Sequence, residues 1–225
     1  MRKMVRRVVQ VWGIGLLIIE VVACSSVIVP PPVPQGTHIG ISLSAHTSIF
    51  ERQLTTIYFA RLEEQQNNFI SKGPLIPSNA KVDNRFYLLN SPPGRYVAIA
   101  ARGLIPQWVT GPTGPSTRTG EGIPYYIAFS KPLIALTEVK AELERLTFMG
   151  HFRVKTRVGS GAADADEVQV NTSIYFKTLP YLGSVEDVKQ GVESAQEFLA
   201  KARDDLGESA WGTIIQESLA FPERK

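Results

Sequence analysis

The stretch 85-RFYLLNSPPGRYVAIAAR-102 carries the first clear prediction about the fold. Apolar residues dominate both of its ends, and Asn90-Ser91-Pro92-Pro93-Gly94 lies between them. Proline fixes φ at an early turn position, and glycine supplies a positive φ at a later one. The stretch therefore predicts a β-hairpin whose two strands flank the Pro-Gly turn.

Strand patterns continue on both sides of this hairpin. The expected further strands are residues 39–45, 54–62, 125–129, 136–143, 146–158 and 168–177. Alternation within 146–158 predicts one face with Phe148, Gly150, Phe152 and Val154, and another with Met149, His151, Arg153 and Lys155. Several short antiparallel strands with turns between them predict a two-layer sandwich.

The segment 86-FYLLNSPPGRYVAIAA-101 resembles the "strand, Pro-Gly, Tyr-aliphatic strand" hairpin of transthyretin-like, carboxypeptidase-regulatory-type modules. The segments YYIAFS, FMGHF and ADEVQ resemble those of bacterial lipoproteins in which such a sandwich continues into a helical tail. The resemblance implies a mainly β, α+β chain, with an antiparallel transthyretin-like β-sandwich over 38–180 and C-terminal α-helices packed on it. It assigns no functional residue.

The tail, residues 181–225, is predicted to be helical. Ser184 and Asp187 have the spacing of a capping box, and Gly207 is placed to end the first helix. The helical stripe consists of Val185, Val188, Val192, Ala195, Phe198, Leu199, Ala202 and Leu206, and a second short helix groups Trp211, Ile214, Ile215 and Leu219 before Pro222. The stripe either covers the sandwich or receives a partner, because an exposed stripe of this size is an aggregation hazard. We expect the packed arrangement.

The chain opens with a basic segment, MRKMVRR, followed by a short apolar run, which is typical of a secretory signal peptide. The run is shorter than the about 20 apolar residues that a spanning helix needs. Residues 21-VVAC-24 resemble the lipobox of bacterial lipoproteins, which implies that residues 1–23 are removed and that Cys24 becomes the acylated N-terminus. Ser25 resembles the outer-membrane sorting pattern. An uncleaved anchor with a buried Cys24 and a signal peptide without lipidation stay open as alternatives.

Residues 24–37 follow as a Pro-rich, extended tether between the anchor and the domain. The expected location is therefore the bacterial cell envelope, on the outer membrane, facing the periplasm or the cell surface. Removing residues 1–23 takes away four of the 24 Lys and Arg and one of the 21 Asp and Glu, which leaves 20 of each. A nucleic-acid partner is not expected, because such a protein needs a clustered basic surface. The densest basic group, Arg153, Lys155 and Arg157, reads as one solvated strand face.

Motifs for catalysis, metals or cofactors are not found in the sequence. His38, His46 and His151 lack the spacing of zinc ligands. The Gly-rich segment 111-GPTGPSTRTGEG-122 precedes a strand rather than a helix, so it is predicted to be a loop and not a phosphate cradle. Asp164, Asp166 and Glu167 lack the calcium-loop pattern and read as an acidic turn.

Two classes of function remain. The first is a lipid-anchored, non-enzymatic interaction or assembly module that contacts the membrane through acylated Cys24 and binds an envelope protein partner. The second is an envelope enzyme or small-ligand receptor whose site lies on the loop 103–124, with Trp108, Arg118 and Glu121. Loops on rigid scaffolds often carry function.

Overall fold

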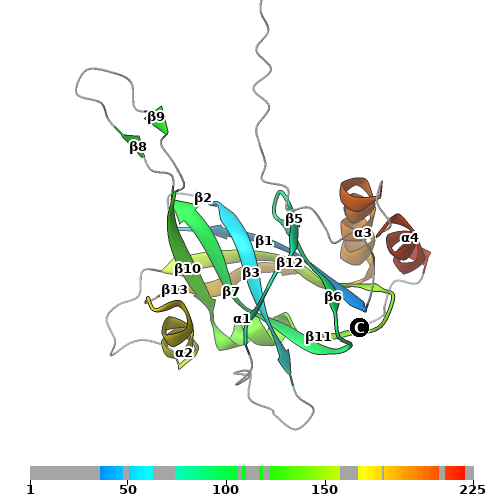
Figure 1. Cartoon of the computed structure of the whole chain (residues 1–225), viewed down its shortest axis with the longest axis horizontal. Coiled ribbons are helices and arrows are strands. Elements are labelled where there is room, and N and C mark those ends of the chain that lie inside the picture. Colours follow the sequence, from blue (N-terminus) through cyan, green and yellow to red (C-terminus); the bar gives the residue numbers. More distant parts are fainter. Residues whose placement is uncertain are drawn as a thin grey trace, which may run out of the picture.

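The computed structural model describes residues 36–47, 51–62, 74–105, 108–109, 117–118, 122–157, 167–178, 180–207 and 211–220. The predicted signal peptide, Cys24 and the tether up to residue 35 lie outside these ranges. The described part is mainly β with four helices, which confirms the coarse prediction of the fold class (Figure 1).

One curled sheet forms most of the domain. Its strands are β1 (Thr37–His46), β2 (Glu51–Arg52), β3 (Leu54–Leu62), β4 (Ile76–Pro77), β5 (Ala80–Val82), β6 (Arg85–Ser91), β7 (Gly94–Ile105), β10 (Ile123–Phe129), β11 (Val139–Ala141), β12 (Leu146–Arg157) and β13 (Tyr181–Lys189). The order is β4-β3-β7-β10-β13-β12-β1-β6-β5, with β11 paired to β7 and β2 to β1. A separate two-stranded sheet joins β8 (Trp108–Val109) to β9 (Thr117–Arg118).

The prediction of an antiparallel sandwich is wrong, because the sheet is mixed. β1 runs parallel to β12, and β10 runs parallel to β13. Parallel neighbours need long crossover connections, and here each pair joins segments that are far apart in the sequence. The local strand and turn pattern does not reveal such pairs.

The two edge strands of the sheet follow one another in the chain. β4 pairs with β3 and β5 pairs with β6, and only Ser78 and Asn79 lie between β4 and β5. The Ser78 hydroxyl accepts a hydrogen bond from the Ile57 amide, and the Asn79 side chain bonds both backbone groups of Leu89. This segment connects the two edges of the sheet and provides hydrogen-bond partners for backbone groups of Ile57 and Leu89, on the strands next to each edge.

The predicted hairpin at Pro92-Pro93-Gly94 is also wrong, although both of its strands exist. β6 pairs with β1 and β5, whereas β7 pairs with β3, β10 and β11. The turn is held from two sides, since Thr37 donates to the Ser91 carbonyl and Tyr96 donates to the Pro92 carbonyl at 2.6 Å. The segment therefore forms a corner between two parts of the sheet.

Two segments exchange the secondary structure that the sequence predicts for them. Residues 168–177, expected to be a strand, lie in α2 (Glu167–Phe176), where the Phe176 ring stacks on Tyr126 of β10. Residues 181–189, expected to begin the helical tail, form β13 between β10 and β12. Ser184 and Asp187 are therefore strand residues and not a capping box. Packing against the sheet overrides the local pattern in both segments.

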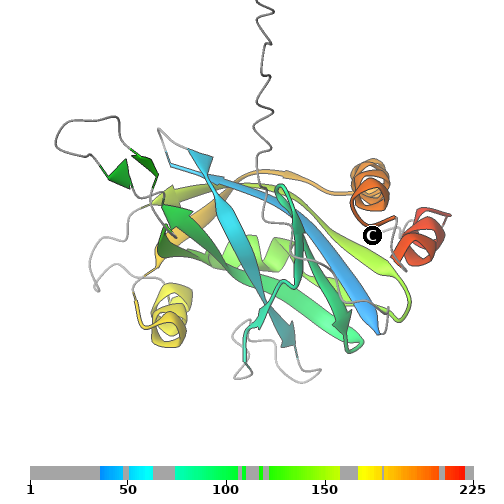
Figure 2. The same cartoon turned by 45° about the horizontal axis from the view of Figure 1, so that its top comes forward.

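The remaining helices agree better with the sequence. α3 (Val192–Leu206) and α4 (Trp211–Ala220) confirm the two helices of the tail, and α3 ends at Gly207 as expected. Of the predicted strand 136–143, only β11 (Val139–Ala141) is a strand. Its first residue, Leu136, is instead the last residue of α1 (Lys131–Leu136). α3 and α4 lie side by side at one end of the sheet, and α2 lies at the other (Figure 2).

Two hydrophobic cores stabilise the domain. The larger one lies within the curl and includes Ile39, Ile57, Phe59, Tyr96 and Ile127, none of them exposed. The smaller one lies between the sheet and the two C-terminal helices and contains Tyr87, Leu89, Phe198, Leu206 and Trp211. Burial of Phe198, Leu199, Ala202 and Leu206 confirms that this part of the predicted stripe packs on the sheet, whereas Val185 and Val188 lie in β13 and Val192 is exposed. Trp211 of the second helix is buried as well.

Candidate binding pocket

A row of side chains crosses four neighbouring strands on the face that carries α3. Arg85 on β6 pairs with Ser42 on β1, Ser42 pairs with His151 on β12, and His151 pairs with Lys189 on β13. The next row consists of Ser44, Arg153 and Asp187. Because alternate residues of a strand share a face, the two rows form one polar floor.

A bulge in β12 places His151 on this floor. The register of β1 against β12 shifts between Gly40 and Ser42, and Gly150 opposite this shift has a φ of 145°. Beyond a bulge the side chains change faces. Phe148 therefore shares the α3 side with His151, whereas Met149 and Phe152 both belong to the inner core. The sequence predicted Phe148 with Phe152, which is wrong for this reason.

A pocket of about 320 Å³ lies over the two rows and beside α3. Its lining includes the hydroxyls of Ser42 and Ser44, the Asn84 amide and the imidazole of His151. The charged lining residues are the cations Arg85, Arg153, Lys189 and Lys201 and the carboxylates Asp187 and Glu197. The pocket is thus predominantly polar, and it is built from four strands and one helix.

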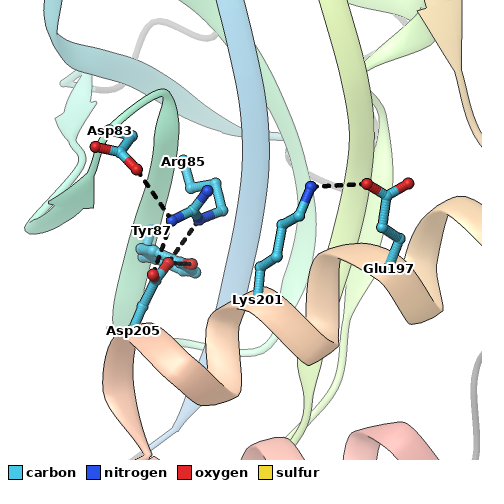
Figure 3. A network of polar contacts seen from close by, with 6 residues as sticks. All are labelled: Asp83, Arg85, Tyr87, Glu197, Lys201 and Asp205. Atoms are coloured by element: carbon cyan, nitrogen blue, oxygen red, sulfur yellow. Dashed lines mark hydrogen bonds and ion pairs between the residues drawn. The ribbon is translucent and has the colours of Figure 1, made fainter.

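The wall formed by α3 is fixed to the sheet by a buried network, shown in Figure 3. Arg85 donates from Nε and Nη2 to the two carboxylate oxygens of Asp205, at 2.6 and 2.8 Å. Tyr87 donates its hydroxyl to the same carboxylate at 2.8 Å. Burial and the nearby negative charge of Asp205 both raise the pKa of Tyr87, which keeps the phenol protonated.

Glu197 and Lys201 form a second pair, on the turns of α3 that precede Asp205 (Figure 3). Lys201 Nζ lies 2.7 Å from Glu197 Oε1, and both side chains are at least half exposed. The hydrogen bond from Lys201 lowers the pKa of the Glu197 carboxyl. Exposed pairs of this kind contribute little to stability, so either side chain can turn toward a ligand.

His151 lies between these charges. Burial lowers the pKa of His151, Glu197 and a backbone hydrogen bond to Ser194 raise it, and the charges of Lys201 and Lys189 lower it further. Its Nε2 atom is buried and has no hydrogen-bond partner among the described residues. Burial is the largest of these effects, so the pKa of His151 lies below its ordinary value.

Arg153, at the other side of the pocket, belongs to a cluster with Glu186. Its Nε lies 2.9 Å from Glu186 Oε2, and His46 Nε2 lies 2.6 Å from the same oxygen. Asp187 lies directly opposite Arg153 in the β12–β13 ladder, where opposite charges attract. Lys189, in contrast, makes no ion pair with any residue that the structure describes.

The sites that the sequence singles out lie elsewhere. β7 extends to Ile105 and β10 begins at Ile123, so the loop 103–124 is shorter than predicted. Trp108 and Arg118 are paired between β8 and β9, and Glu121 lies outside the described residues. His38 and His46 lie at opposite ends of β1. His38 is packed against Trp211 beside the smaller core.

No group of three or more metal-ligating side chains occurs in the part of the chain that the structure describes. Sequence reasoning named Arg153 and His151 but did not connect them to Ser42, Lys189 or Lys201. The signal that could have found the pocket floor is the alternation of polar and apolar residues in 151-HFRVK-155, which is typical of a strand with one polar face.

Within the described ranges, the helices are all too short or too polar to cross a membrane. The sequence matches no protein-family model and no curated protein. Among solved structures, a crystal structure described as "a putative carbohydrate binding protein" from Pseudomonas aeruginosa is similar over 44% of this chain and 83% of that chain, at 11% identity and a TM-score of 0.19. A similarity of this size carries no argument about the fold or the function of this chain.

Proposed function

We propose that the protein is a lipid-anchored protein of the bacterial cell envelope whose folded domain is a non-enzymatic interaction module. The basic start, the apolar run and 21-VVAC-24 support the anchor at Cys24, and Ser25 supports the outer membrane as its location. One acyl chain gives only reversible membrane binding, whereas two or more give stable attachment. The resemblance of 86–101 to transthyretin-like modules stays a prediction and adds no site residue.

The observation that carries the interaction role is the pocket beside α3. Its floor is fixed by the cross-strand register of Ser42, His151 and Lys189, and its wall is fixed by the buried Arg85–Asp205 pair. Preorganised polar groups on rigid elements reduce the ordering cost of binding. We therefore assign the interaction surface to this pocket.

The anchor is tested by replacing Cys24. Cys24→Ala should leave the protein either unprocessed or released from the membrane, whereas the neighbouring control Ser26→Ala should be processed normally. Intact-mass measurement of the wild-type protein should give residues 24–225 plus the mass of the acyl chains. An unmodified thiol at a mature Cys24 would show that the anchor is assigned wrongly.

The interaction role is tested by site-specific photocrosslinking in the native envelope. A photoreactive residue at position 44 lies in the pocket, while one at position 140, on β11, lies outside it and is highly exposed. We expect a discrete adduct from position 44 and none from position 140. Equal labelling from both positions, or none from position 44, would contradict the assignment.

The second candidate function is an enzyme or small-ligand receptor on the loop 103–124. Its one supporting observation is the pairing of Trp108 with Arg118 in the β8–β9 ladder, which brings their backbones together. The double variant Trp108→Ala/Arg118→Ala distinguishes the two candidates. Under the pocket assignment, it leaves the adduct formed from position 44 unchanged.

A further inference from the structure

Two lysines from different elements approach the same imidazole. Lys189 is the cross-strand neighbour of His151, and Lys201 reaches the pocket from α3. Both ammonium charges act on His151 and on Glu197, so these four side chains form one electrostatic cluster. All four side chains line the same pocket.

Three further carboxylates, one lining the pocket and two beside it, share two arginines. Asp205 is held by Arg85, and Glu186 is held by Arg153. Asp187 faces Arg153 across the strand ladder. These acids therefore oppose the binding of an anion less than their number suggests.

The cluster around His151 has a surplus of positive charge. Lys201 is paired with Glu197, and Lys189 has no carboxylate partner among the residues described. The Glu197–Lys201 pair is exposed and replaceable. A ligand oxygen can take the place of the Glu197 carboxylate on Lys201 while also meeting Lys189. The Ser42 hydroxyl, which lies beside His151 in the same row, adds a hydrogen-bond donor.

We propose that the pocket binds a phosphate-type oxyanion between Lys189 and Lys201, above Ser42 and His151. The proposal rests on the pocket being the binding site of the module, and it adds the chemical class of the ligand. Lysine is a common phosphate ligand that acts as a point charge. The phosphate group can belong to a small soluble molecule or to a lipid headgroup near the anchor.

Binding of the anion also changes His151. The groups that act on this ring are Lys189 from β13, Glu197, Lys201 and the Ser194 backbone from α3, and the rings of Phe148 and Phe198. Arg85, Arg153 and Asp187 line the same pocket. Burial and the two lysines disfavour the imidazolium, whereas a bound anion favours it. The pKa of His151 should therefore rise when the pocket is occupied.

The experiment is a titration of the full-length lipidated protein in a non-ionic detergent, at low ionic strength, with inorganic phosphate and with sulfate. Calorimetry gives the affinity, and NMR of labelled histidine rings gives the pKa of His151. The chain has only three histidines, so the rings are readily assigned. We expect saturable binding of both anions and a higher His151 pKa in sulfate, whose own charge does not change.

Variants identify the ligands of the anion. Lys189→Ala and Lys201→Ala should each weaken phosphate binding about tenfold, which is the effect of losing one hydrogen bond to a charged group. The control Lys140→Ala removes an exposed lysine on β11 and should leave the affinity unchanged. Denaturant midpoints should be the same for all three variants. Equal weakening by Lys140→Ala, or the absence of saturable binding, would overturn the proposal.

Further measurements show which molecule carries the phosphate and whether the pocket is a binding site at all. A rise of the His151 pKa when the protein is reconstituted into phosphatidylglycerol bilayers but not into phosphatidylcholine bilayers, together with weak binding of free phosphate, supports a lipid headgroup as the source. If the NMR signals of His151 change with glucose, an uncharged ligand, but not with phosphate or sulfate, the pocket remains the binding site and the proposed class of ligand is refuted. A failed titration with a positive crosslink from position 44 refutes only the ligand class, whereas failure of both refutes the proposed function as well.

Discussion

The guanidinium of Arg85 on β6 forms a two-point hydrogen-bonded ion pair with the carboxylate of Asp205 in the last turn of α3. Both side chains are largely buried, with 14% of Arg85 and 8% of Asp205 exposed. The pair connects residues 120 positions apart. Together with the hydrogen bond from Tyr87, it fixes the last turn of α3, and hence the pocket wall, on the sheet.

Asp205→Ala should lower the free energy of unfolding by about 3 kcal/mol or more, because it removes the buried carboxylate that Arg85 and Tyr87 share. The guanidinium then keeps only its 3.4 Å contact with Asp83, which is exposed. Glu197→Gln is the matched control on the same helix, since its pair with Lys201 is exposed. It should leave the free energy of unfolding nearly unchanged. Urea unfolding of both variants checks the prediction, and equal costs would contradict the structural role of Asp205.

His38 should make the stability of the protein depend on pH. Burial lowers the pKa of His38 from 6.5 to about 4. Its Nδ1 accepts a hydrogen bond from the Asn90 amide at 3.3 Å, which requires an unprotonated Nδ1. The unfolded chain takes up a proton on this residue at a higher pH than the folded protein does. The stabilisation is therefore complete above about pH 6.5 and is lost as the pH falls toward 4.

The expected loss from this residue is about 3 kcal/mol between neutral pH and pH 4. His38→Asn keeps a side-chain acceptor near the Asn90 amide and removes the titration. Unfolding free energies measured across this range should converge for the wild type and the variant as the pH falls. Parallel curves would show that His38 is not held neutral by the fold.

The aromatic side chains of the tail should contribute much of the stability of the C-terminal helices. Phe198 is not exposed at all, and Trp211, at 1% exposure, meets the His38 ring edge-to-face at 4.7 Å. Phe198→Ala and Trp211→Ala should each cost about 3 to 5 kcal/mol. Denaturant midpoints equal to that of the wild type would instead mean that the stripe is open to a partner.

Gly94, at the start of β7, has a φ of 155°. Gly94→Val should lower the thermal midpoint, because a β-branched residue at this φ costs on the order of 1 to 3 kcal/mol. The new side chain would also meet Arg61, which donates to the Pro93 carbonyl at 2.7 Å. Arg61→Ala tests that second effect alone. An unchanged melting temperature for Gly94→Val would show that the corner does not need glycine.

The sequence predicted the positions of individual strands much better than it predicted which strands pair with one another. β1, β3, β10 and β12 lie where apolar alternation and β-branched residues place them. The pairing of β6 with β1 depends instead on a corner that Thr37 and Tyr96 hold through backbone carbonyls. Contacts of this kind join distant positions, so no local pattern reveals them.

The errors at α2 and β13 have a similar origin. Residues 168–177 are rich in β-formers, but Phe176 gains a stacked contact with Tyr126 only when the segment is helical and lies outside the sheet. Gly183, which weakens a helix, fits a strand because Ile127 and Val154 leave no room for a side chain there. The pocket was missed for the same reason, since its floor exists only once β13 lies beside β12.

A close contact between Gly40 and Phe198 gives the sharpest test of how α3 sits on the sheet. A Cβ atom added at Gly40 would lie 2.4 Å from Cε1 and 2.6 Å from Cζ of the Phe198 ring. Gly40 is a central-strand residue paired with Tyr87 and Phe148, so its backbone has little freedom to move away. Gly40→Ala should therefore displace the ring and cost about 1 to 3 kcal/mol, as overpacking of a core does.

The same substitution should be nearly harmless once the ring is gone. In the Phe198→Ala background, Gly40→Ala adds a methyl group to an emptied site, so the double variant should be no less stable than Phe198→Ala alone. Urea unfolding of the four proteins gives the coupling energy of this double-mutant cycle, which we expect to exceed about 1 kcal/mol. Additive costs would mean that the helix does not lie over Gly40, and the pocket wall that α3 provides would have to be placed elsewhere.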